Sequence, residues 1–359
     1  MTIDLQTLGW NNFFEAYFAP YKEQDLLPGR VGIQHKDRYV VYTEVGEVWA
    51  NVRGKLRFEA AGIHDFPAVG DWVALQLRND NTAATIHAVL ERRSKFSRKL
   101  PGKEDEEQIL AANIDIVFLV MGLDANYNLR RLERYLTVAW ESGARPVIVL
   151  NKIDKCNDAQ EKKSEVEQIA HGTDIFLISA KHNIGIEPLR TMLTAGTTGV
   201  LLGPSGVGKS TITNLLVGKD YAQTQEVREW DDRGRHTTAR RELVILPGGG
   251  LIIDTPGLRE LQLWEGETGL EEVFEDIEEL AAQCRFRDCK HISEPDCAVK
   301  RALEEGTLQL ERYESYKKLQ REISYQKRKY DSNAQRVENQ KWKKISKEIK
   351  QIQKGSKRR

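Results

Sequence analysis

The chain has 359 residues, long enough for roughly two or three domains, and its hydrophobic content of 40% is typical of soluble globular proteins. It carries 54 basic and 54 acidic residues, and its N-terminus has neither the basic start nor the apolar stretch of a signal peptide, so we expect a cytoplasmic protein without a membrane partner. The 4 cysteines argue against a disulfide scaffold, and three of them crowd together near the C-terminus, which points to a metal site.

Residues 1–29 are predicted to form a helical extension that ends at Pro28-Gly29. The prediction rests on aromatic residues at helical spacing, namely Trp10, Phe13, Phe14, Tyr17 and Phe18. We expect these rings to dock on the body of the protein rather than to read nucleic-acid bases.

Residues 30–100 alternate between polar and apolar residues, with glycine-rich turns between the alternating runs. This pattern predicts a small β-barrel of the oligonucleotide-binding (OB) type, although the pattern separates it poorly from an SH3-like barrel. A nucleic-acid face and ordinary surface charge explain its basic residues about equally well: Arg53, Lys55, Arg57, Arg92, Arg93, Lys95, Arg98 and Lys99.

Residues 105–265 alternate between apolar strands and helices, which predicts a doubly wound α/β domain with ligand loops at the carboxyl ends of its strands. The expected strands are 114–120, 146–150, 174–178, 199–202, 242–246 and 251–253. The expected helices are 128–142, 159–171 and 209–217.

A guanine-reading motif, Asn151-Lys152-Ile153-Asp154, follows the strand 146–150. The carboxylate of Asp154 can accept hydrogen bonds from N1–H and the exocyclic amine of guanine, and adenine lacks both donors. The motif therefore predicts GTP rather than ATP.

The other residues of the base site are assigned supporting roles. Lys152 is expected to lie along the plane of the base, and Asn151 is expected to brace the loops. The pair Ser179-Ala180 follows the next strand, and we expect the backbone N–H of Ala180 to reach the guanine O6.

A phosphate-binding loop lies between the strand 199–202 and the helix 209–217, as the motif requires. Backbone N–H groups and the helix N-terminus favour bound phosphate. We expect Lys209 to reach the β- and γ-phosphate oxygens and Ser210 to ligate Mg²⁺. The predicted GTP-binding residues of this loop are Gly203, Pro204, Ser205, Gly206, Val207, Gly208, Lys209, Ser210 and Thr211.

The motif Asp254-Thr255-Pro256-Gly257 follows a second apolar strand, where Asp254 can hold the Mg²⁺ shell and the N–H of Gly257 can approach the γ-phosphate. In ordinary GTPases the phosphate loop comes first and the base-reading motif last. Here the base-reading motif precedes the phosphate loop, so the sequence predicts a circularly permuted GTPase domain.

The catalytic group is less clearly marked. Many GTPases place a water-orienting glutamine directly after the motif at residues 254–257, and this chain has Leu258 there, which predicts slow intrinsic hydrolysis. His236 is the candidate replacement, and a simple surface histidine fits the sequence equally well. Thr237 or Thr238 is expected to complete the Mg²⁺ shell.

A metal-binding domain is predicted at residues 266–310, where an acidic helix at 269–282 leads into a Cys-His cluster. Three thiolates and one imidazole match a closed, structural Zn²⁺ site without an open position for catalysis, and a redox dithiol is the alternative. The predicted ligands are Cys284, Cys289, His291 and Cys297.

Residues 311–359 form a predicted basic helical tail with 17 Lys and Arg against 6 Asp and Glu. Such a charge excess indicates an anionic partner, although a solvated charged helix has the same composition.

The sequence resembles the bacterial small ribosomal subunit biogenesis GTPases, the RsgA or YjeQ family, in four features taken together. These are the permuted motif order, the segment 234–238, Leu258 after the motif at 254–257, and the Cys-His spacing. The resemblance covers nearly the whole chain. It implies GTP hydrolysis during late maturation of the small ribosomal subunit, stimulation by that subunit and rRNA contact through the flanking domains. It also implies one zinc ion and a catalytic role for His236.

Two other functions fit parts of the sequence. One is a nucleotide-gated RNA-binding protein whose hydrolysis is incidental, and the other is a signalling GTPase that docks a protein through its metal-binding domain. The basic tail and the barrel favour RNA over a purely protein partner. Nothing in the sequence indicates more than a monomer.

Overall fold

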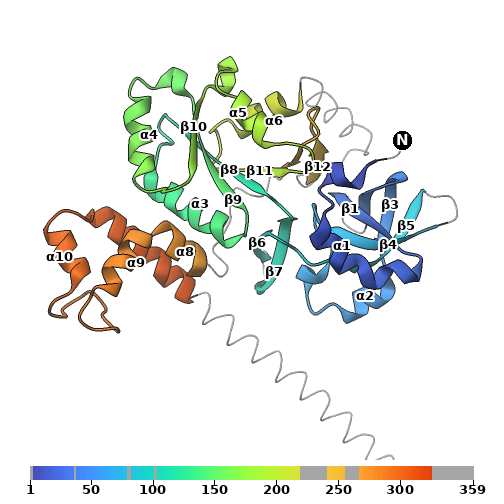
Figure 1. Ribbon diagram of the computed structural model, residues 1–359, viewed down its shortest axis with the longest axis horizontal. Coiled ribbons are helices and arrows are strands. Elements are labelled where there is room, and N and C mark those ends of the chain that lie inside the picture. Colours follow the sequence, from blue (N-terminus) through green and yellow to red (C-terminus); the bar gives the residue numbers. More distant parts are fainter. Residues whose placement is uncertain are drawn as a thin grey trace, which may run out of the picture.

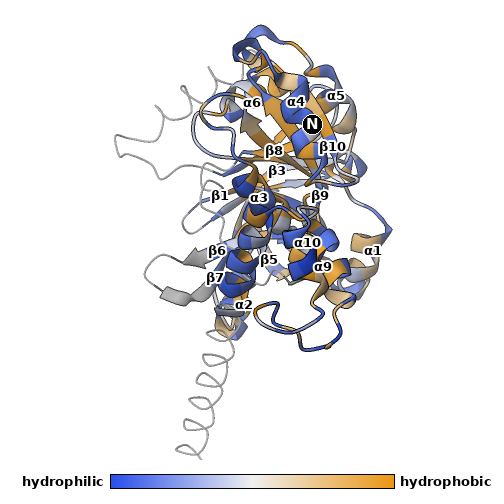
Figure 2. Ribbon diagram, turned by 90° about the vertical axis from the view of Figure 1, so that its left-hand side faces the viewer, coloured by the Kyte–Doolittle hydropathy of each residue, from blue (hydrophilic) through white to orange (hydrophobic). Residues whose placement is uncertain are grey.

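The computed structural model describes residues 3–35, 38–78, 82–100, 103–218, 241–254 and 267–325. Figure 1 shows a β-barrel, a central α/β domain and a C-terminal group of helices that lies beside helix α3. In the described part of the chain, no helix combines the length and the hydrophobicity that crossing a bilayer requires. Hydrophobic residues concentrate along the central strands, and the surrounding loops are mostly hydrophilic (Figure 2).

The N-terminal part folds into three short helices, η1 (Leu5–Leu8), α1 (Asn12–Phe18) and η2 (Ala19–Gln24). Phe14 and Phe18 are buried, and the ring of Trp10 packs 4.8 Å from the ring of Trp72 in the barrel. The expected docking of the aromatic residues is therefore confirmed for these rings. Tyr17, by contrast, remains 47% exposed.

The prediction that Pro28-Gly29 ends the N-terminal extension is wrong, because both residues lie inside strand β1 (Leu27–Gln34). A proline is tolerated near the start of a strand, where its missing N–H interrupts no central ladder. Gly29 is closely packed, and a Cβ there would come within 2.6 Å of Val41 and 2.8 Å of Leu75 in the barrel interior. This glycine serves close packing rather than a turn.

The barrel is completed by β2 (Tyr39–Thr43), β3 (Gly46–Val52), β4 (Trp72–Leu77) and β5 (Ala83–Val89). Its strand order is β1-β2-β3-β5-β4, and β4 pairs back onto β1 to close the barrel. Strands β3 and β5 run parallel, and helix α2 (Gly54–Glu59) and the short helix η3 (Ile63–Asp65) connect β3 to β4. The five strands form the expected OB-type barrel.

The α/β sheet contains β8 (Ile116–Gly122), β9 (Arg145–Asn151), β10 (Asp174–Ile178), β11 (Thr198–Leu202), β12 (Glu242–Ile245) and β13 (Leu251–Asp254). Its order is β10-β9-β8-β11-β13-β12, with parallel pairing except between β12 and β13. Every residue of β8 is buried, as expected for a strand that is covered on both faces.

Helices flank this sheet: α3 (Leu129–Glu141), α4 (Ala159–Glu167), α5 (Glu187–Met192) and α6 (Lys209–Val217). All the strands and helices expected for this domain are present, although α4 ends four residues before the predicted boundary. The short helix α5 was not predicted, and neither was the hairpin of β6 (Lys95–Leu100) and β7 (Lys103–Ala112).

The barrel and the α/β domain share one continuous sheet. Strand β1 pairs with β12 in antiparallel register, with Ile33 opposite Glu242, and the hydroxyl of Tyr42 donates to the carbonyl of Leu243 over 3.3 Å. The two domains are therefore joined by backbone pairing as well as by side-chain contacts.

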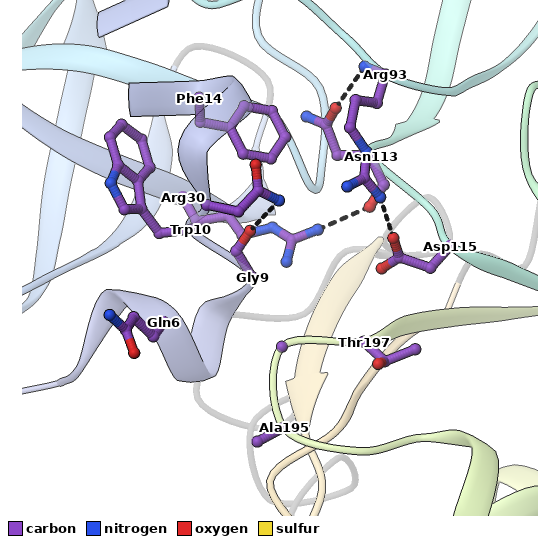
Figure 3. Close-up of a pocket in the computed structure, with 12 residues that line it drawn as sticks. Gln6, Gly9, Trp10, Phe14, Arg30, Arg93, Asn113, Asp115, Ala195 and Thr197 are labelled. Atoms are coloured by element: carbon purple, nitrogen blue, oxygen red, sulfur yellow. Dashed lines mark hydrogen bonds and ion pairs between the residues drawn. The ribbon is translucent and has the colours of Figure 1, made fainter. Parts of the chain in front are cut away.

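A second junction between these domains is built around Arg30, which is 1% exposed and lines a cavity of about 250 Å³ (Figure 3). Its guanidinium donates to the carbonyls of Leu8, Gly70 (3.2 Å) and Asn113 (2.9 Å). Burial lowers the pKa of Arg30 to about 10, so this arginine remains charged near neutral pH. One side chain thus ties three segments of the chain together.

The C-terminal helices are α8 (Glu267–Val273), α9 (Glu275–Ala282), α10 (Ala298–Glu304) and a helix that covers residues 310–325. The prediction of one acidic helix over 269–282 is wrong, because the backbone leaves helical geometry at Phe274 (φ −116°, ψ 33°). The break buries the ring of Phe274 completely against Tyr316, at a centroid distance of 5.5 Å.

One buried and one half-buried set of ion pairs fasten the 310–325 helix to α3 of the α/β domain. Arg312, 5% exposed, donates to Glu133 of α3 over 3.0 Å and to both carboxylate oxygens of Asp276 over 2.8 and 2.7 Å. A second pair joins Arg134 of α3 to both oxygens of Glu322 over 2.6 and 2.7 Å. Burial raises the pKa of Glu133, and the neighbouring guanidinium groups oppose this rise.

Candidate guanine-nucleotide and metal sites

The described residues of the candidate nucleotide site converge at one edge of the α/β sheet. The contributing positions lie at or just after the carboxyl ends of five strands: Asp124 after β8, Asn151 on β9, Ser179 after β10, Gly203 after β11 and Asp254 on β13. Parallel strands present their carboxyl ends at the same edge, where ligands of open α/β sheets bind. The site does not depend on the order of its motifs in the chain.

The phosphate loop requires glycine at two positions where other parts of the site approach it. Gly203 (φ +155°) lies against the carbonyl of Val120, and Gly208 (φ +101°) lies against the side-chain amide of Asn151, so a Cβ at either position would clash. Lys209 donates from Nζ to the carbonyls of Gly203 over 2.6 Å and Pro204 over 2.7 Å. The ammonium group is therefore held at the loop that would receive the phosphates.

The remaining residues of the phosphate loop differ in burial. Val207 is fully buried in the core, whereas Ser205, Gly206, Ser210 and Thr211 are exposed. The exposed residues belong to the part of the loop that precedes and begins α6, where helix N–H groups favour bound phosphate.

Asn151 connects the base-reading loop to two other loops. Its side-chain amide donates to the carbonyl of Val207 over 2.8 Å, and its Oδ1 accepts the N–H groups of Lys152 (2.8 Å) and Ala180 (2.9 Å). Asn151 thus braces the loops, as expected. The N–H of Ala180, which the sequence assigned to the guanine O6, is instead donated to Asn151 in this structure.

Lys152 adopts a left-handed backbone conformation (φ +71°) that directs its side chain across the site. Its Nζ donates to the carbonyl of Gly206 in the phosphate loop and to Asp124 over 2.7 Å. The hydrogen bond from Lys152 is the main reason why the pKa of Asp124 falls to about 2. Asp124 is absent from the predicted site, and its only signal in the sequence is its place just after a buried strand.

Asp154 is positioned by Ser179, whose hydroxyl donates to Oδ1 of the carboxylate, while Nε2 of His182 lies 3.8 Å from Oδ2. The hydrogen bond from Ser179 lowers the pKa of Asp154, which keeps the carboxylate ionised. An ionised carboxylate can only accept hydrogen bonds, as recognition of guanine N1–H and the exocyclic amine requires. Ile153 packs against the core from the same loop.

Several predicted residues fall outside the described part of the chain. These are His236, Thr237, Thr238, Gly257 and Leu258. Asp254 is described and ends β13, where it pairs with Glu242 of β12.

The Cys-His cluster brings its four predicted ligand atoms within 4.8 Å of one another, an arrangement that can hold a metal ion. Sγ of Cys284 lies 3.8 Å from Sγ of Cys297 and 3.6 Å from Nδ1 of His291, and Nδ1 of His291 lies 3.3 Å from Sγ of Cys297. A tetrahedral zinc ion with zinc–sulfur distances of about 2.3 Å places its sulfur ligands roughly 3.8 Å apart. Both the donor set and its spacing therefore fit zinc.

Hydrogen bonds from backbone N–H groups to one carboxylate within the loop fix the conformation of the loop that carries these ligands. The carboxylate of Glu294 accepts the N–H groups of Lys290, Ile292 and Ser293, and these hydrogen bonds lower the pKa of Glu294 to about 2. His291 has a φ of +57°, which turns the chain between the cysteines.

The basic residues that fit either a nucleic-acid face or ordinary surface charge differ in their contacts. Arg92 donates to Asp71 over 2.8 and 2.7 Å, Arg93 pairs with Asp115, and Lys95 lies 2.9 Å from Glu107. Each of these three residues therefore has an acidic partner within the protein. Five of these basic residues are exposed: Arg53, Lys55, Arg57, Arg93 and Lys95.

Known proteins match this chain over most of its length. The family model described as RsgA GTPase matches residues 89–264. The small ribosomal subunit biogenesis GTPase RsgA of Opitutus terrae is 48% identical over 350 residues, which span 95% of each chain. The small ribosomal subunit biogenesis GTPase RsgA 2 of Lactiplantibacillus plantarum is 47% identical over 326 residues, which span 91% of each chain.

Two solved structures share the fold. YjeQ from Thermotoga maritima is 29% identical with a TM-score of 0.61, and the match covers 83% of this chain and 98% of YjeQ. YloQ, described as a circularly permuted GTPase, is 25% identical with a TM-score of 0.59, and the match covers 85% of this chain and 97% of YloQ.

Proposed function

The chain belongs to the RsgA GTPase family, and we propose that it binds GTP with Mg²⁺ and hydrolyses it on the small ribosomal subunit during late maturation in the cytoplasm. The observation that carries the proposal is the direct hydrogen bonding between the base-reading loop and the phosphate loop. Asn151 reaches Val207, and Lys152 reaches Gly206. Both relatives described above are named small ribosomal subunit biogenesis GTPases, which supports the proposal.

The roles of the residues follow from their chemistry. Asp154 accepts the guanine donors, Lys209 neutralises phosphate charge, and Ser210 and Thr238 ligate Mg²⁺ with Asp254 in its outer shell. Together with these, the GTP contacts come from the remaining residues of the two loops and their partners: Asn151, Lys152, Ile153, Ser179, Ala180, Gly203, Pro204, Ser205, Gly206, Val207, Gly208, Thr211 and Gly257.

We assign the orientation of the attacking water to His236, because Leu258 cannot hold a water molecule by hydrogen bonding. The assignment predicts that His236→Ala retains GTP affinity but loses about 10²- to 10⁴-fold in stimulated turnover. The matched control is His171→Ala, which removes an exposed histidine in the turn between α4 and β10. Undiminished stimulated turnover of His236→Ala would remove the histidine from the mechanism.

The function itself is tested by measuring GTP hydrolysis with purified small subunits, large subunits or protein-free RNA. We expect strong stimulation by small subunits alone. Equal stimulation by any RNA would instead indicate a general RNA-binding GTPase, and no stimulation by any of them would leave the ribosomal assignment without support.

We infer that the Cys-His cluster holds one structural Zn²⁺ ion, with Cys284, Cys289, His291 and Cys297 as ligands. The donor set and the spacing of the ligand atoms support this assignment. A closed set of four protein ligands leaves no position for a substrate, so the metal would stabilise the loop between α9 and α10.

Cys289→Ser is therefore expected to lower bound zinc from one ion per chain to a small fraction of that value. Cys156→Ser is the matched control, because Cys156 lies outside the cluster near the base-reading loop and should leave zinc content unchanged. Elemental analysis of dialysed protein checks both values. Full zinc content in Cys289→Ser would contradict the assignment.

A further inference from the structure

The cavity beside Arg30, called the junction cavity below, lies at the opposite edge of the α/β sheet from the nucleotide site. Asp115 precedes the first residue of β8, and residues 195–197 precede the first residue of β11, which is the parallel neighbour of β8. The nucleotide loops follow the carboxyl ends of these two strands, whereas the junction cavity borders their amino ends. It is therefore separate from the site described above.

Three parts of the chain form the walls of the junction cavity. The N-terminal extension contributes residues between Gln6 and Phe14, the barrel contributes Arg30, and the α/β domain contributes Asp115 and residues 195–197. Figure 3 shows the guanidinium of Arg30 between Gly9 and Asn113. Most of the lining is polar. Empty cavities in proteins are apolar, whereas a polar cavity holds water or a polar ligand.

Arg30 brings a charge into this cavity without a carboxylate partner. Among the described residues, the other fully buried arginine is Arg312, which contacts the carboxylates of Glu133 and Asp276. Arg30 donates to three backbone carbonyls instead. Carbonyl groups are dipoles and leave the net charge of the guanidinium in place, and a buried charge is costly unless an opposite charge pairs with it. A guanidinium has five N–H donors, so two remain beyond these three hydrogen bonds.

The single carboxylate that lines the cavity does not cancel this charge. Asp115 forms an ion pair through Oδ1 with Arg93, and its Oδ2 accepts the backbone N–H of Thr198 over 2.8 Å. Both oxygens of Asp115 are therefore engaged, and its charge is matched by that of Arg93. With two arginines against one aspartate, the lining keeps the positive charge of Arg30.

The charge, the donors and the size of the cavity favour one class of ligand. Guanidinium groups bind oxyanions through pairs of N–H donors, and the hydroxyl of Thr197 in the wall can donate as well. The volume of about 250 Å³ is below the roughly 300–1,000 Å³ of pockets that enclose drug-sized ligands. A small ion therefore fits this cavity better than a nucleotide does.

We propose that the junction cavity binds a small oxyanion, phosphate or sulfate, on the guanidinium of Arg30, with Arg93 and Thr197 at the more accessible side. The bound anion supplies the negative charge that Arg30 lacks. It contacts the N-terminal extension, the barrel and the α/β domain at once, so it fastens the extension to the rest of the protein. The extension already contacts the wall of the α/β domain directly, since the N–H of Gly196 donates to the carbonyl of Thr7 over 3.1 Å.

The test measures binding of inorganic phosphate to the full-length protein by calorimetry, at an ionic strength held constant with potassium chloride. The phosphate loop also attracts phosphate. It is therefore filled beforehand with Mg²⁺ and a saturating GTP analogue that cannot be hydrolysed. We expect one phosphate ion per chain to bind under these conditions and sulfate to compete with it. Phosphate should also slow hydrogen exchange of the backbone in residues 5–18.

Two pairs of variants place the ion. Thr197→Val and Thr194→Val each break the same contact of 3.0 Å between the two hydroxyl groups, but of these two residues Thr197 alone lines the cavity. Phosphate affinity should therefore fall in Thr197→Val and stay unchanged in Thr194→Val. Arg93→Gln should weaken phosphate binding by about 10-fold, as expected for the loss of one charged donor. Its matched control is Arg301→Gln, which changes an exposed arginine on α10.

Arg30→Met should abolish phosphate binding, provided that its melting temperature shows a folded chain. The variants of Thr197 and Arg93 keep the test decisive without it, because neither residue is fully buried.

Three results would overturn the proposal. Loss of phosphate binding when the GTP analogue is added would place the ion in the phosphate loop. Wild-type phosphate affinity in both Thr197→Val and Arg93→Gln would place it elsewhere on the protein. Displacement of phosphate by an equal concentration of chloride would show general screening rather than a site. If the analogue itself fails to bind, the proposed function fails, whereas the two pairs of variants still test the cavity.

Discussion

Asp154→Asn is expected to lower the affinity for GTP by on the order of 10²- to 10³-fold, because a carboxylate that accepts two guanine donors is replaced by an amide that presents a donor to one of them. The same change should raise affinity for xanthosine triphosphate, whose base has a carbonyl where guanine has its exocyclic amine. Competition binding with the two nucleotides measures both effects. The hydrogen bond from Ser179 keeps this side chain in place for either base.

The control for this substitution is Asp158→Asn, which changes a carboxylate nearby in the chain that contacts Cys156 and Lys162 instead. We expect it to leave the preference between the two nucleotides unchanged. Unaltered GTP affinity in Asp154→Asn would show that Asp154 does not read the base. Loss of both nucleotides together would point to a collapsed loop, which a lowered melting temperature would reveal.

Arg312→Ala should destabilise the protein by about 3–5 kcal/mol, the usual cost of removing one partner from a buried ion pair. The change leaves Glu133, which is fully buried, without the guanidinium that contacts it from the 310–325 helix. We expect this helix to separate from α3. Denaturant unfolding gives the free energy, and hydrogen exchange of residues 310–325 shows where the stability is lost.

Arg301→Ala provides the comparison, because Arg301 is an exposed arginine on α10 and its removal should cost less than about 0.5 kcal/mol. The double variant Glu133→Gln with Arg312→Met should lose less than Arg312→Ala alone, since the buried residue 133 then carries no charge that Arg312 had helped to neutralise. Equal unfolding free energies for Arg312→Ala and Arg301→Ala would show that the buried pairs do not hold the helix.

The nucleotide site was predictable because its parts are short motifs at strand ends. Buried parallel strands appear in the sequence as apolar runs, and their carboxyl ends meet at one edge, so the positions of Asn151 and Gly203 followed from the strands alone. Asp124 was not predictable. Asp124 belongs to the site because its carboxylate accepts a hydrogen bond from the ammonium of Lys152 over 2.7 Å. The two residues are 28 positions apart in the chain, so their contact could not be read from the sequence.

The errors share a physical cause, because each involves a residue whose surroundings override its local preference. Pro28-Gly29 usually ends an element, yet the barrel needs an empty space where Gly29 lies. The acidic stretch 269–282 was expected to form one helix, but burying the ring of Phe274 broke it. His236, Thr238 and Gly257 lie outside the described residues, so their roles stay predictions.

The antiparallel pairing of β1 with β12 also bears on how the protein is made. The hydroxyl of Tyr42 and the carbonyl of Leu243 meet although they lie 201 positions apart in the chain. On the ribosome that synthesises the protein, the barrel emerges early and can close on itself through β4, but the outer edge of β1 must wait for β12. Contacts this distant in sequence form slowly, because the intervening chain loses entropy when its ends meet. The joining of the first strand to one of the last can thus begin only after more than two thirds of the chain has emerged.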